Sequence, residues 1–135
     1  MNLDEFKEYL NSKNHDASAL LGSLTTNADC LSELESQIKN TDEYERILKV
    51  AKVITDDAQN DIAHLNVISD EVFNHSNREE FYSDCYMEFL TINFTLKCCA
   101  CQATRIEDIS KHIVNKYGVI LQHVHGMEFN KIIAV

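Results

Sequence analysis

The chain has 135 residues, of which 44% are apolar and 25% charged, and this is the composition of one globular domain rather than of a disordered segment. Its net charge of −10 argues against direct binding to nucleic acid or to an anionic membrane, because both surfaces are negative. No apolar run approaches the ~18 residues of a membrane span, and the acidic start of the chain does not resemble a signal peptide. We therefore expect a cytoplasmic protein with reduced cysteines.

The first half of the chain shows the seven-residue apolar repeat of packed helices. A short helix is predicted over residues 2–11, with Asn2 as its N-cap, followed by a polar break and a second helix over 16–39. A third helix of about thirty residues is predicted to start near residue 41. The last two helices would form a long antiparallel helical hairpin, followed by a loop and a short helix over 74–88.

Residues 88–99 allow two interpretations. Apolar side chains at every second position, from Leu90 to Cys98, predict a half-buried strand. A rival pattern spaced by seven would instead allow one long helix over 78–117; its members are Cys85, Ile92, Cys99, Ile106 and Ile113. We favour the strand because Thr104 and Glu107 form a capping box that would start a new helix at 105, and because threonine and asparagine at 91, 93 and 95 are poor helix formers.

The C-terminal part then reads as a small sheet. A helix over 105–117, ended by Gly118, would be followed by strands over 119–124 and 127–135. The predicted fold class is therefore α+β, in a single domain over residues 1–135. N-terminal helices, including the long antiparallel hairpin, would occupy residues 1–87, and a β-α-β-β unit would occupy residues 88–135.

This sheet would bring cysteines and histidines together. The two strands of a β-α-β unit are parallel and end at the same sheet edge. Cys98, Cys99 and Cys101 follow the first strand, and His123 and His125 end the second. Thiolate and imidazole suit zinc, so a metal- or thiol-dependent protein is one alternative function. The spacing lacks the Cys-x-x-Cys knuckle of structural zinc sites, and cysteines that simply pack in the core are the favoured interpretation.

The charge pattern supplies the leading functional hypothesis. Residues 1–88 carry 19 acidic and 7 basic side chains, whereas residues 89–135 carry 3 and 5. The candidate binding carboxylates are Glu43, Glu45, Asp56, Asp57 and Asp61. They would suit a basic protein partner. No phosphate-binding glycine loop, nucleophile elbow or zinc-protease motif is present.

We therefore expect a protein that is not an enzyme, needs no cofactor and occludes a basic surface of a partner, as an inhibitor, an immunity (antidote) protein or an adaptor does. A mimic of DNA charge is the second alternative, after the metal- or thiol-dependent protein. A homodimer is a further expectation, because the apolar stripe of the hairpin or the terminal strand could pair with a second copy.

Overall fold

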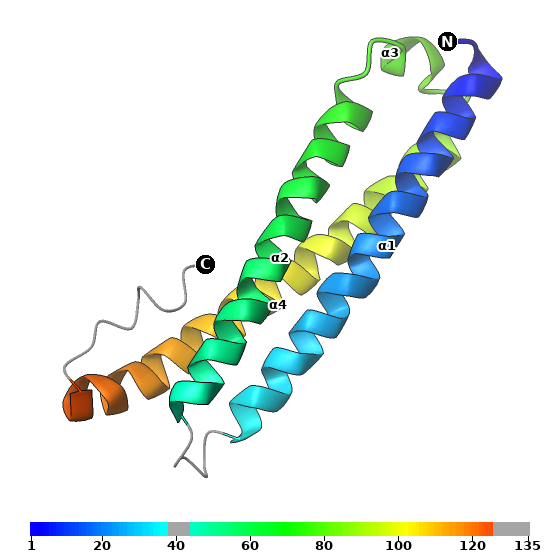
Figure 1. The fold of residues 1–135 in the computed structure, drawn as a ribbon. Coiled ribbons are helices and arrows are strands. Elements are labelled where there is room, and N and C mark those ends of the chain that lie inside the picture. Colours follow the sequence, from blue (N-terminus) through cyan, green and yellow to red (C-terminus); the bar gives the residue numbers. More distant parts are fainter. Residues whose placement is uncertain (38–43, 126–135) are drawn as a thin grey trace.

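The computed structural model describes residues 1–37 and 44–125, with only the backbone described for 117–125, and these residues form a three-helix bundle with one short connecting helix. The helices are α1 (Leu3–Ser36), α2 (Tyr44–Phe73), α3 (Arg78–Phe81) and α4 (Tyr86–His125). In Figure 1, α1 and α2 lie side by side and run in opposite directions, and α4 crosses behind them in the same direction as α1.

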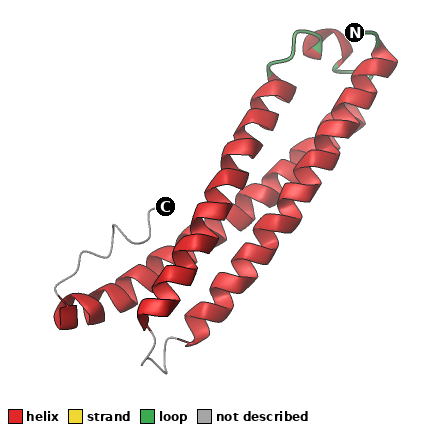
Figure 2. Cartoon of the chain, in the orientation of Figure 1, coloured by secondary structure: helices red, strands yellow, loops and turns green. Residues whose placement is uncertain are grey.

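The predicted α+β fold is wrong, because the described residues contain no strand (Figure 2). Residues 88–99 and 119–124, expected as strands, lie within α4, which also continues past Gly118. The seven-residue spacing decides the outcome: Cys85, Ile92, Cys99, Ile106 and Ile113 are each at most 1% exposed. The strand pattern would have buried Leu90 and Phe94, which are 44% and 69% exposed. The strand expected over 127–135 lies outside the described residues.

Two threonines that argued against a helix are accommodated by it. The Thr91 hydroxyl donates to the carbonyl oxygen of Met87 at 2.8 Å, one turn earlier in the helix. The Thr95 hydroxyl contacts the carbonyl oxygen of Thr91 at 3.1 Å and the side-chain oxygen of Asn14 on α1 at 2.7 Å. Because these hydroxyls have partners inside the helix or on its neighbour, packing outweighs the few tenths of a kcal/mol by which threonine disfavours a helix.

The first helix is also longer than expected. The predicted N-cap is confirmed, since the Asn2 side chain accepts a hydrogen bond of 2.9 Å from the backbone N–H of Glu5. The predicted break near residues 12–16 is wrong, because α1 runs without interruption to Ser36. Polar residues of that stretch contact the other helices instead: Lys13 forms an ion pair with Glu71 on α2, and Asn14 accepts from Thr95 on α4.

The core is divided into two groups of buried side chains. The group beside α3 contains aromatic and aliphatic residues from the first turns of α1, the end of α2 and the start of α4, namely Phe6, Leu10, Ile68, Val72, Cys85, Phe89 and Ile92. The other group fills the rest of the bundle with leucine and isoleucine side chains, among which lie small residues such as Ala17, Ala28 and Ala51. The small residues let the helices approach closely, and α1 packs most extensively against α4.

Candidate functional site

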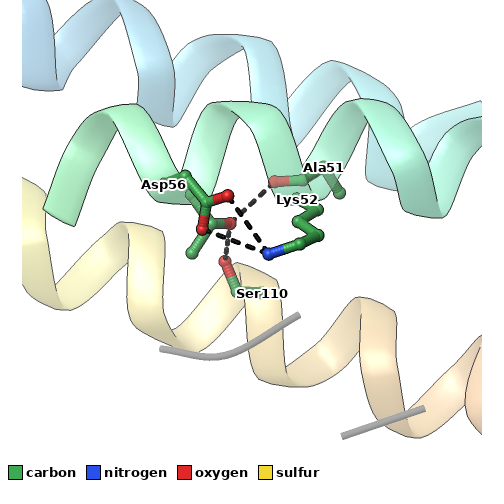
Figure 3. Close-up of polar contacts among 5 residues, drawn as sticks. Ala51, Lys52, Asp56 and Ser110 are labelled. Carbon is green, nitrogen blue, oxygen red and sulfur yellow. Dashed lines mark hydrogen bonds and ion pairs between the residues drawn. The ribbon is translucent and has the colours of Figure 1, made fainter. Parts of the chain in front are cut away.

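The carboxylates proposed for partner binding do not form one face. Asp56 lies on the outer side of α2, where the Lys52 ammonium pairs with it at 3.1 Å (Figure 3). Glu45 is exposed in the first turn of α2. Glu43 lies outside the described residues. A pair one turn apart on the helix surface, such as Lys52 with Asp56, is worth only about 0.3–0.5 kcal/mol, so this ion pair leaves Asp56 available to a partner.

Asp57 and Asp61 face α1 rather than the outer side of α2. The Asn27 side-chain amide donates to Asp57 at 2.8 Å, and the Ser23 hydroxyl donates to Asp61 at 2.6 Å. These two bonds connect the helices of the hairpin along the side that lies away from α4. An ionised carboxylate can accept about four hydrogen bonds, so both groups keep free acceptor positions toward solvent.

The described surface also contains a shallow groove that the sequence analysis missed. It lies between the end of α1 and the start of α2, has a volume of about 300 Å³, and is lined by Cys30, Glu33, Leu34, Gln37, Val50 and Ile54. Its walls are mostly apolar, and the exposed Glu33 is among the residues that line it. Val53 of α2, which does not line the groove, is also exposed. The sequence does hint at an apolar surface here, because Val50 and Val53 lie outside the seven-residue repeat that fills the core.

The three neighbouring cysteines point in different directions because they follow one another on a helix rather than a strand. Cys99 is buried at 1% exposure, and its thiol donates to the carbonyl oxygen of Ala17 at 3.5 Å. Cys98 is half-buried and Cys101 is exposed. Burial raises the pKa of the Cys99 thiol to about 11, so this group is a neutral packing residue at physiological pH. The predicted strand had placed Cys98, rather than Cys99, on its buried face.

The histidines are far from these cysteines. His123 lies 24 positions after Cys99 on the same helix, which corresponds to about 36 Å along the axis, and His125 lies farther still. The shared sheet edge that would have joined them does not exist in the described residues. Among the described side chains, no group of three or more histidine, cysteine or acidic residues is placed to hold a metal ion.

The buried polar groups of the bundle act between helices. Thr55 on α2 and Ser110 on α4 are both fully buried, with their hydroxyl oxygens 3.3 Å apart (Figure 3). The Thr55 hydroxyl donates its proton to the carbonyl oxygen of Ala51 at 2.8 Å. The proton between the two side chains must therefore come from Ser110. A pair of this kind has a role in helix register, because a shift of either helix would leave a buried hydroxyl without a partner.

The described helices include none that is both long and apolar enough to cross a membrane. Comparison of the chain with protein-family models, with curated proteins and with solved structures finds no match in any of the three.

Proposed function

We propose that the protein is a binding protein that occludes a basic surface on another protein, as an inhibitor, an immunity protein or an adaptor does. The observation that carries this proposal is the distribution of charge over the bundle. Helix α1 carries seven acidic and two basic side chains and α2 carries six and three, whereas α4 carries three and four. The acidic side chains are therefore concentrated on α1 and α2, although Asp29 and Glu35 of α1 lie beside Arg105 and His112 of α4.

The α1–α2 groove gives this acidic side a place for a basic side chain. Its apolar walls, formed by Leu34, Val50 and Ile54, suit the methylene stem of a lysine or arginine. The carboxylate of Glu33, which lines the groove, would receive the charged end of such a side chain through a charge-assisted hydrogen bond. Asp57, one turn beyond Val53 on α2, adds a second carboxylate to the same side of the bundle.

The proposed setting is the cytoplasm, which keeps thiols reduced. All five cysteines of the chain are free, and Cys30 and Cys101 are exposed to solvent. In an oxidising compartment, such exposed thiols would form disulfides between chains.

The test reverses one charge on each side of the bundle. Glu33→Lys and Asp108→Lys change the net charge equally, but the first lies at the groove and the second on the exposed surface of α4. Tagged protein from the native host should retain a partner with the wild type and with Asp108→Lys, and lose it with Glu33→Lys. The association rate of that purified partner should then fall about tenfold or more from low to high salt, because the carboxylates steer the encounter.

Two results would contradict the proposal. One is an association rate that does not change with salt. The other is a loss of binding in Asp108→Lys as large as that in Glu33→Lys, which would show that overall charge, rather than the α1–α2 side, governs binding.

A further inference from the structure

Two of the three neighbouring cysteines lie on the same side of α4. Cys98 and Cys101 are three residues apart, so they are separated by about 60° around the helix axis and about 4.5 Å along it. Residues at this spacing are neighbours on a helix surface, whereas residues one or two apart do not face each other. The pair therefore has the Cys-x-x-Cys spacing after all, with Cys99 and Ala100 as the intervening residues.

The two thiols differ in their access to solvent. Cys101 is exposed and Cys98 is half-buried. Cysteines that respond to oxidation are commonly arranged in this way, with an accessible thiol that reacts first and a second thiol beside it that resolves the product. Cys30, the other exposed cysteine, is the only cysteine of α1 and has no such neighbour on its helix.

The charge of the surrounding stretch of α4 is positive, although the chain as a whole is acidic. From Phe89 to Ile106, α4 contains no acidic residue, and its charged side chains are Lys97 and Arg105. Lys97 precedes Cys101 by four residues and Arg105 follows it by four, so each lies one helical turn from the exposed thiol. A reagent with negative charge is therefore attracted to this thiol.

The nearby carboxylates reduce this attraction only in part. Asp29 of α1 accepts a hydrogen bond of 2.8 Å from Arg105 and offsets its charge. Glu107 lies about 9 Å beyond Cys101 along α4 and pairs with Lys111. Lys97 is exposed, and no carboxylate in the described part of the chain pairs with it. Lys97 is thus the free positive charge beside the pair.

We propose that Cys98 and Cys101 form a thiol-oxidation site, whose reagent is a small disulfide of net negative charge. The Cys101 thiolate attacks one sulfur of the reagent, so that a mixed disulfide forms and one thiolate leaves. The Cys98 thiolate then attacks the Cys101 sulfur, the Cys98–Cys101 bond forms, and the second thiolate leaves. Two electrons pass to the reagent, and its two thiolates take up the two protons that the cysteines release.

Helix geometry makes this disulfide a labile one. The Cα atoms of residues three apart lie about 5 Å from each other, within the range of about 4.4–6.8 Å that a disulfide spans. Their Cβ atoms are about 5–6 Å apart, whereas a disulfide needs about 3.5–4.5 Å, so closure strains this turn of α4. Strained disulfides are readily reduced, and such bonds serve reversible rather than permanent roles. The site stands independently of the proposed function, because neither cysteine lines the α1–α2 groove.

The first experiment follows the thiols by mass spectrometry in the Cys30→Ser protein, which lacks the other exposed cysteine. After the folded, reduced protein is incubated with oxidised glutathione, each chain should hold a Cys98–Cys101 disulfide and a free Cys99, and should have released two molecules of glutathione. Adding Cys98→Ser should stop the reaction at a mixed disulfide on Cys101. Adding Cys101→Ser should slow it at least about tenfold, because only a half-buried thiol remains. Millimolar reduced glutathione should reopen the wild-type bond.

The second experiment tests the charge of the reagent against cystamine, a small disulfide with an ammonium group at each end. Lys97→Glu should lower the ratio of the rate with oxidised glutathione to the rate with cystamine at least about threefold. The ratio cancels any change in the reactivity of the thiol itself. Lys111→Glu is the matched control, because it makes the same change of charge about 15 Å beyond Cys101, where salt screens it, and it should leave the ratio unchanged.

Four results would overturn the proposal. The first is a mixed disulfide on Cys101 that persists although Cys98 is present, and the second is disulfides that form only between chains. The third is a Cys98–Cys101 bond that reduced glutathione does not reopen. The fourth is a ratio of rates that Lys97→Glu leaves unchanged, which would show that the charge beside the pair does not select the reagent.

Discussion

The substitution Ile92→Ala tests which side of α4 faces the core. Ile92 is fully buried, and its truncation removes about three methylene groups, or about 2.4 kcal/mol of transfer free energy. The partly collapsed cavity raises the expected loss in unfolding free energy to about 3–4 kcal/mol. With a urea dependence of about 2 kcal/mol per molar for a chain of this size, the denaturation midpoint should fall by about 1.5–2 M, which circular dichroism at 222 nm (the helical band) can follow.

Phe94→Ala is the matched control, because Phe94 lies two positions away and is 69% exposed. Its unfolding free energy should change by no more than about 0.5 kcal/mol. A loss of about 2 kcal/mol for Phe94→Ala would refute the helical phase, since only the strand phase places Phe94 in the core beside Ile92. A negligible loss for Ile92→Ala would refute it equally.

Four further results are expected. A thiol reagent should modify Cys101 within the folded protein and reach Cys99 only on unfolding, as mass spectrometry of the labelled peptides can show. Burial raises the pKa of Cys99 from 9.0 to about 11, so the stability that its neutral thiol contributes is complete below pH 9 and is lost as the pH rises through 11. The denaturation midpoint of the wild type should therefore fall between pH 9 and pH 11, and that of Cys99→Ala should fall less. A double-mutant cycle on Thr55→Val and Ser110→Ala should give a coupling of about 0.5–1.5 kcal/mol, and additive losses would argue against their hydrogen bond. Chelation by EDTA should leave the melting temperature unchanged, whereas elemental analysis that finds about one zinc per chain would revive the metal hypothesis.

The sequence predicted those helices well in which apolar residues occupy a single face. The long helix that begins at Tyr44 has nearly the expected bounds, because its buried residues recur every seven positions from Ala51 to Val72. The short helix before α4 was also expected within residues 74–88, and α3 lies there. In these segments, periodicity and capping agree on one structure.

The prediction failed where a helix carries apolar residues on two faces. In α4, Ile92 lies in the core and Leu96 packs against it, while Leu90 and Phe94 are exposed on the opposite side, and the four together imitate the alternation of a strand. The zinc hypothesis depended on the same predicted strand, because a shared sheet edge was to bring the cysteines and histidines together. Sequence periodicity alone cannot distinguish a strand from a helix with apolar residues on two faces unless the neighbours of the helix are known.

The pairing of α1 with α4 has a consequence for synthesis of the chain. Ala17 contacts Cys99, and Asn14 contacts Thr95, so contacts that close the core join residues 82 and 81 positions apart. At about 5–20 residues per second, the ribosome needs about 4–16 s to add that stretch, whereas a helix forms in about a microsecond. The apolar face of the nascent α1 therefore stays partly exposed, with only α2 to cover it, until α4 has been synthesised. Seven acidic side chains on α1 repel those of neighbouring nascent chains during this interval and so oppose their aggregation.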